Sequence, residues 1–360
     1  MGHEDPNPWL GARADHDDPN PWLGAGTDHG DPHHEFGAGT DHDVRVLVEW
    51  VHREPAPRME YTEVPWGRFH HAGGPAEDVP DLLARIRSSD PRNAARALAL
   101  LHHAVRHQST VYPPAALAVP FLLRIAAAPS THHRADVLWL AAKSGRTDYH
   151  GSGLRTDLLK VTDPPEQWVF DSRGYPMNWS VQAARQALAA NVHTLRTLLA
   201  DPDAQVRCLA GYALSAVLSG AEDATDALRG RLRAEEVPEV RISLVLAIGQ
   251  LAREHHDRAG AVDWTRELWS SPEQTAETRL GAALAWLALT EEAVPDRLLT
   301  ILTRVMTPAA VDAMSRVPWT WDFGTADTGV YLCLTRMLGV HARRVLGERT
   351  QELAEPEPWG

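Results

Sequence analysis

The sequence predicts an all-α protein: an alpha-alpha superhelix of stacked helical hairpins behind a disordered acidic tail. Three observations support this prediction. From residue 75 onward, apolar residues recur at spacings of three and four, the period of one helix face. Several helix starts share one layout at intervals of 34 and 38 residues. Residues 1–43 hold very few side chains that could form a core.

Composition and charge narrow the class of partner. The 360-residue chain has a formal net charge of −13, and residues 1–43 hold ten carboxylates against Arg13. This balance removes the main electrostatic driving force for nucleic acid, so we expect no nucleic-acid partner. No apolar run is long enough for a membrane helix, which predicts no membrane partner. Two cysteines, Cys208 and Cys333, without a secretory signal indicate a reduced protein in the cytoplasm.

The tail consists of three near-copies of thirteen residues, DPNPWLGARADHD, DPNPWLGAGTDHG and DPHHEFGAGTDHD, over residues 5–43. Asp-Pro pairs favour turns or extended chain, and this composition cannot offset its ordering entropy. We therefore expect residues 1–43 to be disordered. Two further hypotheses stay open: the repeated Asp-His pairs as weak metal ligands, and Trp9 and Trp22 as a short binding motif presented twice.

Residues 44–74 form a connecting segment, which opens with an apolar stretch that fits a helix or a strand equally well. The repeat domain then covers 75–350, and 351–360 is a C-terminal tail. Segments with a helical period follow one another along this domain: 75–89, 90–108, 112–129, 132–145, 179–200, 201–220, 224–235, 237–255, 261–271, 272–290 and 294–306.

A long insert at 146–178 interrupts the helices and shows no clear period. Connections of this length in a compact domain are often functional. The insert carries Trp168 and Tyr175, which we take as candidate binding residues.

The helix starts that share a layout place an acidic residue six positions before an arginine. The pairs are Asp90 with Arg96, Asp201 with Arg207, and Glu235 with Arg241, and a looser copy holds Arg279. The steps from Arg207 to Arg241 to Arg279 are long enough for two helices and two turns. Because one helical hairpin cannot bury its apolar face alone, such copies stack into a continuous core.

The stretch DPDAQVRCLAGYAL resembles the second helix of a repeat in the HEAT-repeat superfamily. This resemblance implies an α solenoid in which Asp201 and Arg207 belong to a structural ladder between successive repeats.

Two upstream stretches, HAGGPAEDVPDLL and HQSTVYPPAALAVPFLL, resemble a group of uncharacterised bacterial HEAT-repeat proteins. The chain keeps His71, His107, Gln108 and Tyr112 of that pattern, and has Ser109 where the group usually has Gly. The resemblance covers about residues 65–305 and implies a fold but no activity.

Histidines supply the candidate polar site. His103 and His107 lie four apart on an expected helix, so they face one way, and His102, or His70 with His71, could join them at a metal. No Glu-x-x-His or Cys partner completes a recognised ligand set, which favours hydrogen-bonding roles and predicts no metal and no cofactor. No sequence motif for a catalytic nucleophile is present.

Near the C-terminal end, RVPWTWDFGTAD places Trp319 and Trp321 between helices. Two interpretations are equally open: these aromatics anchor a partner, or they cap the last repeat.

Together these features favour a non-enzymatic scaffold or adaptor that binds a protein partner on a concave face built by the second helices and the insert. The candidate binding residues are His71, His103, His107, Gln108, Tyr112, Trp168, Tyr175, Trp319 and Trp321. One alternative is an enzyme, since HEAT-like folds include DNA glycosylases that remove alkylated bases, and bilin lyases carry related repeats. Another is a toxin-neutralising, immunity-type protein.

Overall fold

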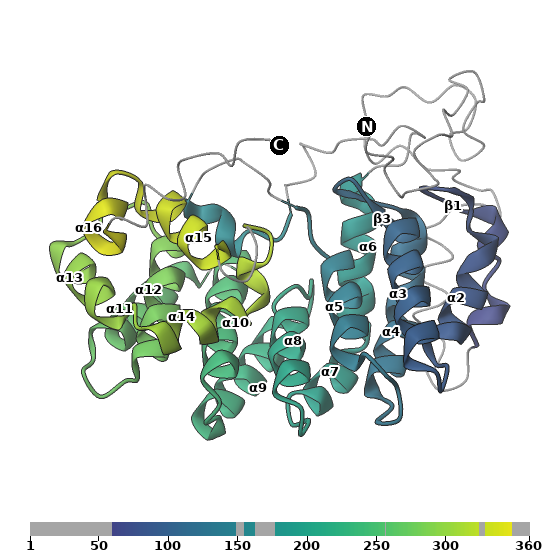
Figure 1. Cartoon of the computed structure of the whole chain (residues 1–360), viewed down its shortest axis with the longest axis horizontal. Coiled ribbons are helices and arrows are strands. Elements are labelled where there is room, and N and C mark those ends of the chain that lie inside the picture. Colours follow the sequence, from purple (N-terminus) through teal and green to yellow (C-terminus); the bar gives the residue numbers. More distant parts are fainter. Residues whose placement is uncertain (1–59, 149–154, 163–176, 256, 324–327, 348–360) are drawn as a thin grey trace, which may run out of the picture. The chain divides into compact units, whose positions relative to one another are not determined.

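Figure 1 shows the computed structural model, which describes residues 60–148, 155–162, 177–255, 257–323 and 328–347. The repeats at 5–43, the apolar stretch after them, Trp168, Tyr175 and the C-terminal tail lie outside these described residues. The chain divides into two compact units: unit 1 is 1–147 with 162–191, and unit 2 is 148–161 with 192–360. Apart from two hairpins of two-residue strands, the regular structure of the described residues is helical, which confirms the all-α prediction.

Unit 1 begins with short turns that bury two aromatic side chains, Trp66 and Phe69. Its elements in chain order are η1 (Tyr61–Glu63), η2 (Trp66–Arg68), β1 (His70–His71), β2 (Gly74–Pro75), η3 (Ala76–Asp78), α2 (Val79–Ile86), α3 (Pro91–Val105), β3 (Arg106–His107), β4 (Thr110–Val111), α4 (Pro113–Ala127), α5 (Arg134–Ser144) and α6 (Met177–Ala190).

Helix α4 is the central helix of unit 1 and is apolar on nearly all sides. It packs against α5, α6 and β1, so apolar residues on a single face could not supply all of these contacts. Helix α3 starts where the Asp-Pro signal predicts: Asp90 is the N-cap and its Oδ1 accepts the N–H of Arg92 at 3.0 Å. Sequence and structure therefore agree on the start of this helix.

The hairpin between α3 and α4 has a two-residue turn in which both residues are left-handed. Gln108 has φ +48° and Ser109 has φ +67°, while His107 pairs with Thr110 across the turn. Such turns favour Asn-Gly because a side chain disfavours positive φ. Ser109, the position where the resembling group has Gly, therefore holds a conformation that glycine adopts more readily.

Unit 2 is a succession of helices joined by short turns. Its elements are η4 (Arg155–Leu159), α7 (Val192–Leu198), α8 (Ala204–Leu214), α9 (Ala221–Ala234), α10 (Pro238–Glu254), α11 (Arg258–Ser270), α12 (Ala276–Leu289), α13 (Asp296–Val305), α14 (Pro308–Ser315), η6 (Pro318–Thr320), α15 (Gly329–Leu338), η7 (Gly339–His341) and α16 (Ala342–Leu346).

Within unit 2, α7 packs on α8, α9 on α10 and α11 on α12, and α10 also contacts both α8 and α12. The contacts keep a regular offset along the chain: the Ser243 hydroxyl donates to the Cys208 carbonyl at 2.9 Å, 35 residues away. Gly281 allows α12 to approach α10 closely, since a Cβ there would lie 3.3 Å from the Cα of Ile242. The 34- and 38-residue steps thus correspond to consecutive packed helix pairs.

The second helices of two of these pairs also contact elements outside the pairs. Helices α10 and α12 contact η4 and α14, and α12 also contacts α15 (Figure 1). Trp319 of η6 is 4% exposed; its ring meets Tyr212 edge-on at 4.7 Å and its N–H donates to Gln250 Oε1 at 3.1 Å. Trp319 therefore packs inside unit 2, against side chains of α8 and α10.

None of the helices in the part of the chain that the structure describes combines the length and the apolar character required to cross a membrane.

Candidate functional site

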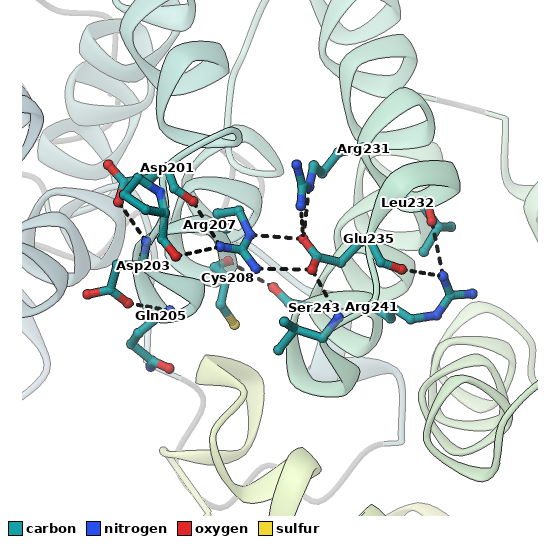
Figure 2. A network of polar contacts seen from close by, with 12 residues as sticks. Asp201, Asp203, Gln205, Arg207, Cys208, Arg231, Leu232, Glu235, Arg241 and Ser243 are labelled. Atoms are coloured by element: carbon teal, nitrogen blue, oxygen red, sulfur yellow. Dashed lines mark hydrogen bonds and ion pairs between the residues drawn. The ribbon is translucent and has the colours of Figure 1, made fainter.

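A cluster of charged side chains in unit 2 surrounds Arg207 (Figure 2). Its guanidinium donates two parallel bonds to the Glu235 carboxylate, at 2.9 and 3.0 Å. Its remaining terminal nitrogen donates to the backbone carbonyls of Asp201 at 2.8 Å and Pro202 at 3.0 Å. Arg207 therefore ties the turn before α8 to the residue that ends α9.

Glu235 uses both oxygens twice. Besides Arg207, Oε1 accepts the N–H of Val237 at 3.0 Å and Oε2 accepts Arg231 Nε at 2.8 Å. Burial alone would raise the pKa of this carboxyl, but the bonds from Arg207, Val237 and Arg231 outweigh it and lower the pKa to about 2. A carboxylate with every acceptor site filled has no lone pair for a substrate, so this cluster is structural.

An arginine that donates to backbone carbonyls near the end of the preceding helix is also found at the next two helix pairs. Arg241 donates to the carbonyls of Leu232 and Glu235, at 3.1 and 2.8 Å, and to Thr278 Oγ1 at 3.0 Å. Arg279 donates to the Trp269 carbonyl at 3.1 Å. These carbonyls lie at or just beyond the C-terminal ends of α9 and α11, where a cation satisfies unpaired acceptors and the helix dipole. Arg96, the fourth arginine of the sequence pattern, is exposed on α3.

In unit 1, polar side chains gather in a pocket of about 170 Å³ between α2, α3 and the β1–β2 hairpin. We call it the His–Asp pocket. Its lining residues are His71, Ala72, Gly73, Asp78, Asp81, Leu82, Arg85, Leu100, His103, Ala104 and His107. The structure therefore brings together three histidines that the sequence singled out: His71, His103 and His107.

His71 is fixed through both ring nitrogens. Nδ1 accepts the backbone N–H of Gly73 at 3.0 Å, which requires Nδ1 to be unprotonated in this arrangement. The proton then resides on Nε2, which donates to Asp78 Oδ1 at 2.7 Å. Because both nitrogens are used and the ring is 4% exposed, His71 holds the hairpin on α2 and has no nitrogen left for a metal or a substrate proton.

The other two histidines are accessible. His103 is exposed and His107 half-buried, and their ring centroids lie 6.5 Å apart. No group of three or more His, Cys, Asp or Glu side chains within the described residues could hold a metal ion. His102 points elsewhere, with its ring edge-on to Trp139 at 5.2 Å.

Acidic and basic groups complete the His–Asp pocket at its rim. The side chains of Asp78 and Asp81 are 48% and 69% exposed, and Arg85 lies 3.4 Å from Asp81. The Arg85 guanidinium also donates to Asn93 Oδ1 at 3.3 Å. Arg85 thus pairs with Asp81, while Asp78 pairs with His71. Sequence reasoning missed Asp81 and Arg85, although the spacing of three from Asp78 to Asp81 and of four from Asp81 to Arg85 places them on one helix face.

The remaining predicted binding residues do not line this pocket. Gln108 is exposed in the left-handed turn, and Tyr112 is buried as the N-cap of α4. Trp319 is buried in unit 2, and Trp321 is half-buried with its N–H on the Ser315 carbonyl at 3.0 Å.

Both cysteines are buried and free. Burial raises the pKa of the Cys208 and Cys333 thiols to about 12, so neither is a thiolate near neutral pH.

Comparison with known proteins adds little. No family model matches the chain, and no curated protein matches it. Two solved chains match, and one of them is the crystal structure of an engineered protein. It is 18% identical, and the match covers 76% of this chain and 97% of that chain at a TM-score of 0.26. At that TM-score the similarity carries no argument.

Proposed function

We propose that the protein is a non-enzymatic binding scaffold of the HEAT-like solenoid type, and that its partner is a protein presenting a basic side chain to the His–Asp pocket. The observation that carries this proposal is the composition of the pocket: two exposed carboxylates, Asp78 and Asp81, beside the accessible imidazole of His103. Carboxylates and neutral imidazole nitrogens accept hydrogen bonds from arginine or lysine.

The size of the pocket supports a protein side chain over a larger ligand. Pockets for drug-sized molecules start at about 300 Å³, whereas this one has about 170 Å³. One guanidinium or ammonium group with part of its stem fits that space. The net charge of −13 would also steer a basic partner towards the chain.

Two features of the described residues favour binding over catalysis at this pocket. His71, which is hydrogen-bonded to the carboxylate of Asp78, has no free ring nitrogen. A base-removing enzyme would need an accessible Trp and a lone Asp on an arginine-lined inner face, whereas Trp319 is buried against Tyr212 and bonded to Gln250. A toxin-neutralising protein is one form of the binding proposal, because it needs only a basic partner.

The experiment compares two charge-matched double variants of the full chain as bait in extracts of the native cells. Asp81→Asn with His103→Ala changes two exposed pocket residues. Asp226→Asn with His193→Ala makes the same chemical changes at exposed positions in unit 2. We expect a basic protein to be retained by the parent and the unit 2 variant and lost by the pocket variant.

Equal retention by both double variants would remove the His–Asp pocket from the proposal. Nucleic acid retained in place of protein would overturn the choice of partner class.

A further inference from the structure

A second pocket of unit 1 has the opposite charge from most of the chain. It has a volume of about 190 Å³ and lies between η1 and the C-terminal ends of α2 and α4. We call it the Arg–Phe pocket; its lining residues are Glu60, Tyr61, Arg87, Phe121, Arg124, Ile125 and Ala128. Two guanidinium groups against one carboxylate make it locally positive on a chain of net charge −13.

The floor of the Arg–Phe pocket is aromatic and aliphatic. Phe121 meets the ring of Tyr61 edge-on at 6.1 Å, and the Arg124 guanidinium carbon lies 4.6 Å from the centroid of Phe121. The wall is fixed, because Trp66 Nε1 donates to the Tyr61 carbonyl at 2.6 Å. Phe121 and Ile125 are 2% and 5% exposed, so the apolar floor is narrow and accepts the edge of an aromatic ring rather than its face.

The two arginines are close enough to repel each other. Burial lowers the pKa of Arg124, the carboxylate of Glu60 acts against this, and the positive charge of Arg87 lowers the pKa further. Arg87 is exposed as the C-cap of α2. An anionic group between the two guanidinium groups would relieve this repulsion. The pocket thus suits a ligand that combines a carboxylate with an aromatic ring.

The chain carries such a ligand immediately upstream. Residues 5–43 repeat Asp-Pro contexts around Trp9, Trp22 and Phe36, and residues 1–43 contribute −9 of the net charge. The residue at which the described chain begins, Glu60, itself lines the Arg–Phe pocket. The sixteen residues between 43 and 60 span at most about 55 Å when extended, so the repeats are tethered within reach at a local concentration of about millimolar.

We propose that the Arg–Phe pocket docks the acidic repeats of the chain's own N-terminal segment. The indole of Trp9 or Trp22 points its edge at the narrow floor of Phe121 and Ile125, and the neighbouring aspartates pair with Arg87 and Arg124. Two near-identical copies compete for one pocket, so the tryptophan left over remains accessible. This inference uses a different pocket from the proposed function and stands or falls independently of it.

The test measures distances by pulsed electron resonance in the full-length chain with two introduced cysteines. Ala25→Cys carries one spin label within the second repeat, and Ser130→Cys carries the other at an exposed turn after α4. The native thiols are buried, so the labels react with the introduced cysteines. We expect a short-distance population in this parent, and loss of that population when Trp9→Ala and Trp22→Ala are combined.

Arg87→Glu is the deciding variant because it reverses one pocket charge and leaves the contact of Arg124 with Phe121 in place. Arg229→Glu, exposed on α9, is its charge-matched control. We expect the short-distance population to disappear only in Arg87→Glu. The inference is overturned if both variants keep the parent distribution. It is also overturned if about tenfold excess of unlabelled chain removes the short distances, because the repeats of a second copy would then be the occupant.

Discussion

Two helix starts with the same sequence layout behave differently in the two units. Asp90-Pro91 and Asp201-Pro202 each precede an arginine by the same interval. In unit 2, Arg207 is 7% exposed and bonded to four oxygens of three residues. In unit 1, Arg96 is exposed, and no hydrogen bond or ion pair joins it to another described residue. The shared layout alone does not create the ladder.

The position of the N-cap explains the difference. Helix α3 is capped by Asp90, so Arg96 is its sixth residue. Helix α8 is capped by Asp203, so Arg207 is its fourth residue. The two-residue shift turns the side chain by about 200° around the helix. Arg241 and Arg279 are also fourth residues of their helices.

One residue decides which cap is used. The position of Asp203 is occupied in unit 1 by Arg92, which cannot cap a helix, so the helix starts earlier at Asp90. The backbone hydrogen bonds agree with these cap positions. In α8 the N–H of Arg207 donates to the carbonyl of the cap Asp203, whereas in α3 the N–H of Ala94 donates to the carbonyl of the cap Asp90. Whether the arginine is buried and bonded as in Arg207 therefore depends on the position of the N-cap and not on the Asp-Pro pair.

The largest expected difference comes from removing the two arginines. Arg207→Ala leaves the Glu235 carboxylate buried with one cation fewer, so we expect a loss of about 3–5 kcal/mol in the free energy of unfolding. Arg96→Ala removes an exposed side chain and should cost less than about 0.5 kcal/mol. Urea unfolding followed by circular dichroism measures both, and equal losses would contradict the comparison.

Acid should weaken unit 2 through Glu235. Its folded-state pKa of about 2 lies below the ordinary value of 4.5, so its stabilisation is present above about pH 4.5 and is lost as the pH falls towards 2. The linked free energy is about 3 kcal/mol. Thermal melts of parent and Glu235→Gln between pH 5 and 2 should show a smaller acid-dependent drop in the variant.

Glu236→Gln is the matched control for this measurement, since Glu236 is exposed beside Glu235. If Glu236→Gln flattened the pH dependence as much as Glu235→Gln, the assignment to the buried carboxylate would be wrong.

Replacement of the N-cap aspartate should lower the free energy of unfolding by the same amount in both units, although replacement of the arginine should not. Asp90 accepts the Arg92 N–H at 3.0 Å and Asp203 accepts the Gln205 N–H at 2.8 Å. Replacement of either by Ala should lose about 1 kcal/mol. Chemical denaturation of both variants checks this. A loss several times larger for Asp203→Ala alone would mean that the cap also holds Arg207 in register.

The smallest effect concerns the left-handed turn of unit 1. Ser109→Gly removes the steric cost of φ +67° while increasing the freedom of the unfolded chain, so we expect a net gain of about 0.5 kcal/mol. A small rise in melting temperature is the readout. Ser130→Gly, at a turn residue without positive φ, should lower the melting temperature slightly.

The helical class and most helix boundaries followed from apolar spacing and Asp-Pro signals, because these act within one or two turns. The spacing of Arg207, Arg241 and Arg279 indicated a repeat, and the structural role of Arg207 was implied by the resemblance to HEAT repeats. The different role of Arg96 could not be predicted from the six-residue interval, since it depends on which of two nearby residues caps the helix. The sequence also could not decide whether Trp319 is buried, because its burial depends on contact with Tyr212 more than 100 residues away.

Similar reasons limit how much of the candidate site could be predicted from the sequence. His103 and His107 could be paired from their spacing, but the use of both nitrogens of His71 depends on the Gly73 backbone and on Asp78. The Arg–Phe pocket combines residues of α2 and α4 with η1, and no local pattern joins them.

The division into units has a consequence for how the chain is made. Residues 148–161 belong to unit 2 but precede the last helix of unit 1, and Leu159 packs beside Gly249 of α10. No single cut of the chain therefore separates the units. During synthesis, η4 leaves the ribosome well before α12, the helix it contacts. At 5–20 residues per second, α12 is synthesised on the order of ten seconds after η4. Until then the apolar side chains of η4, Leu158 and Leu159, lack their contact with α12.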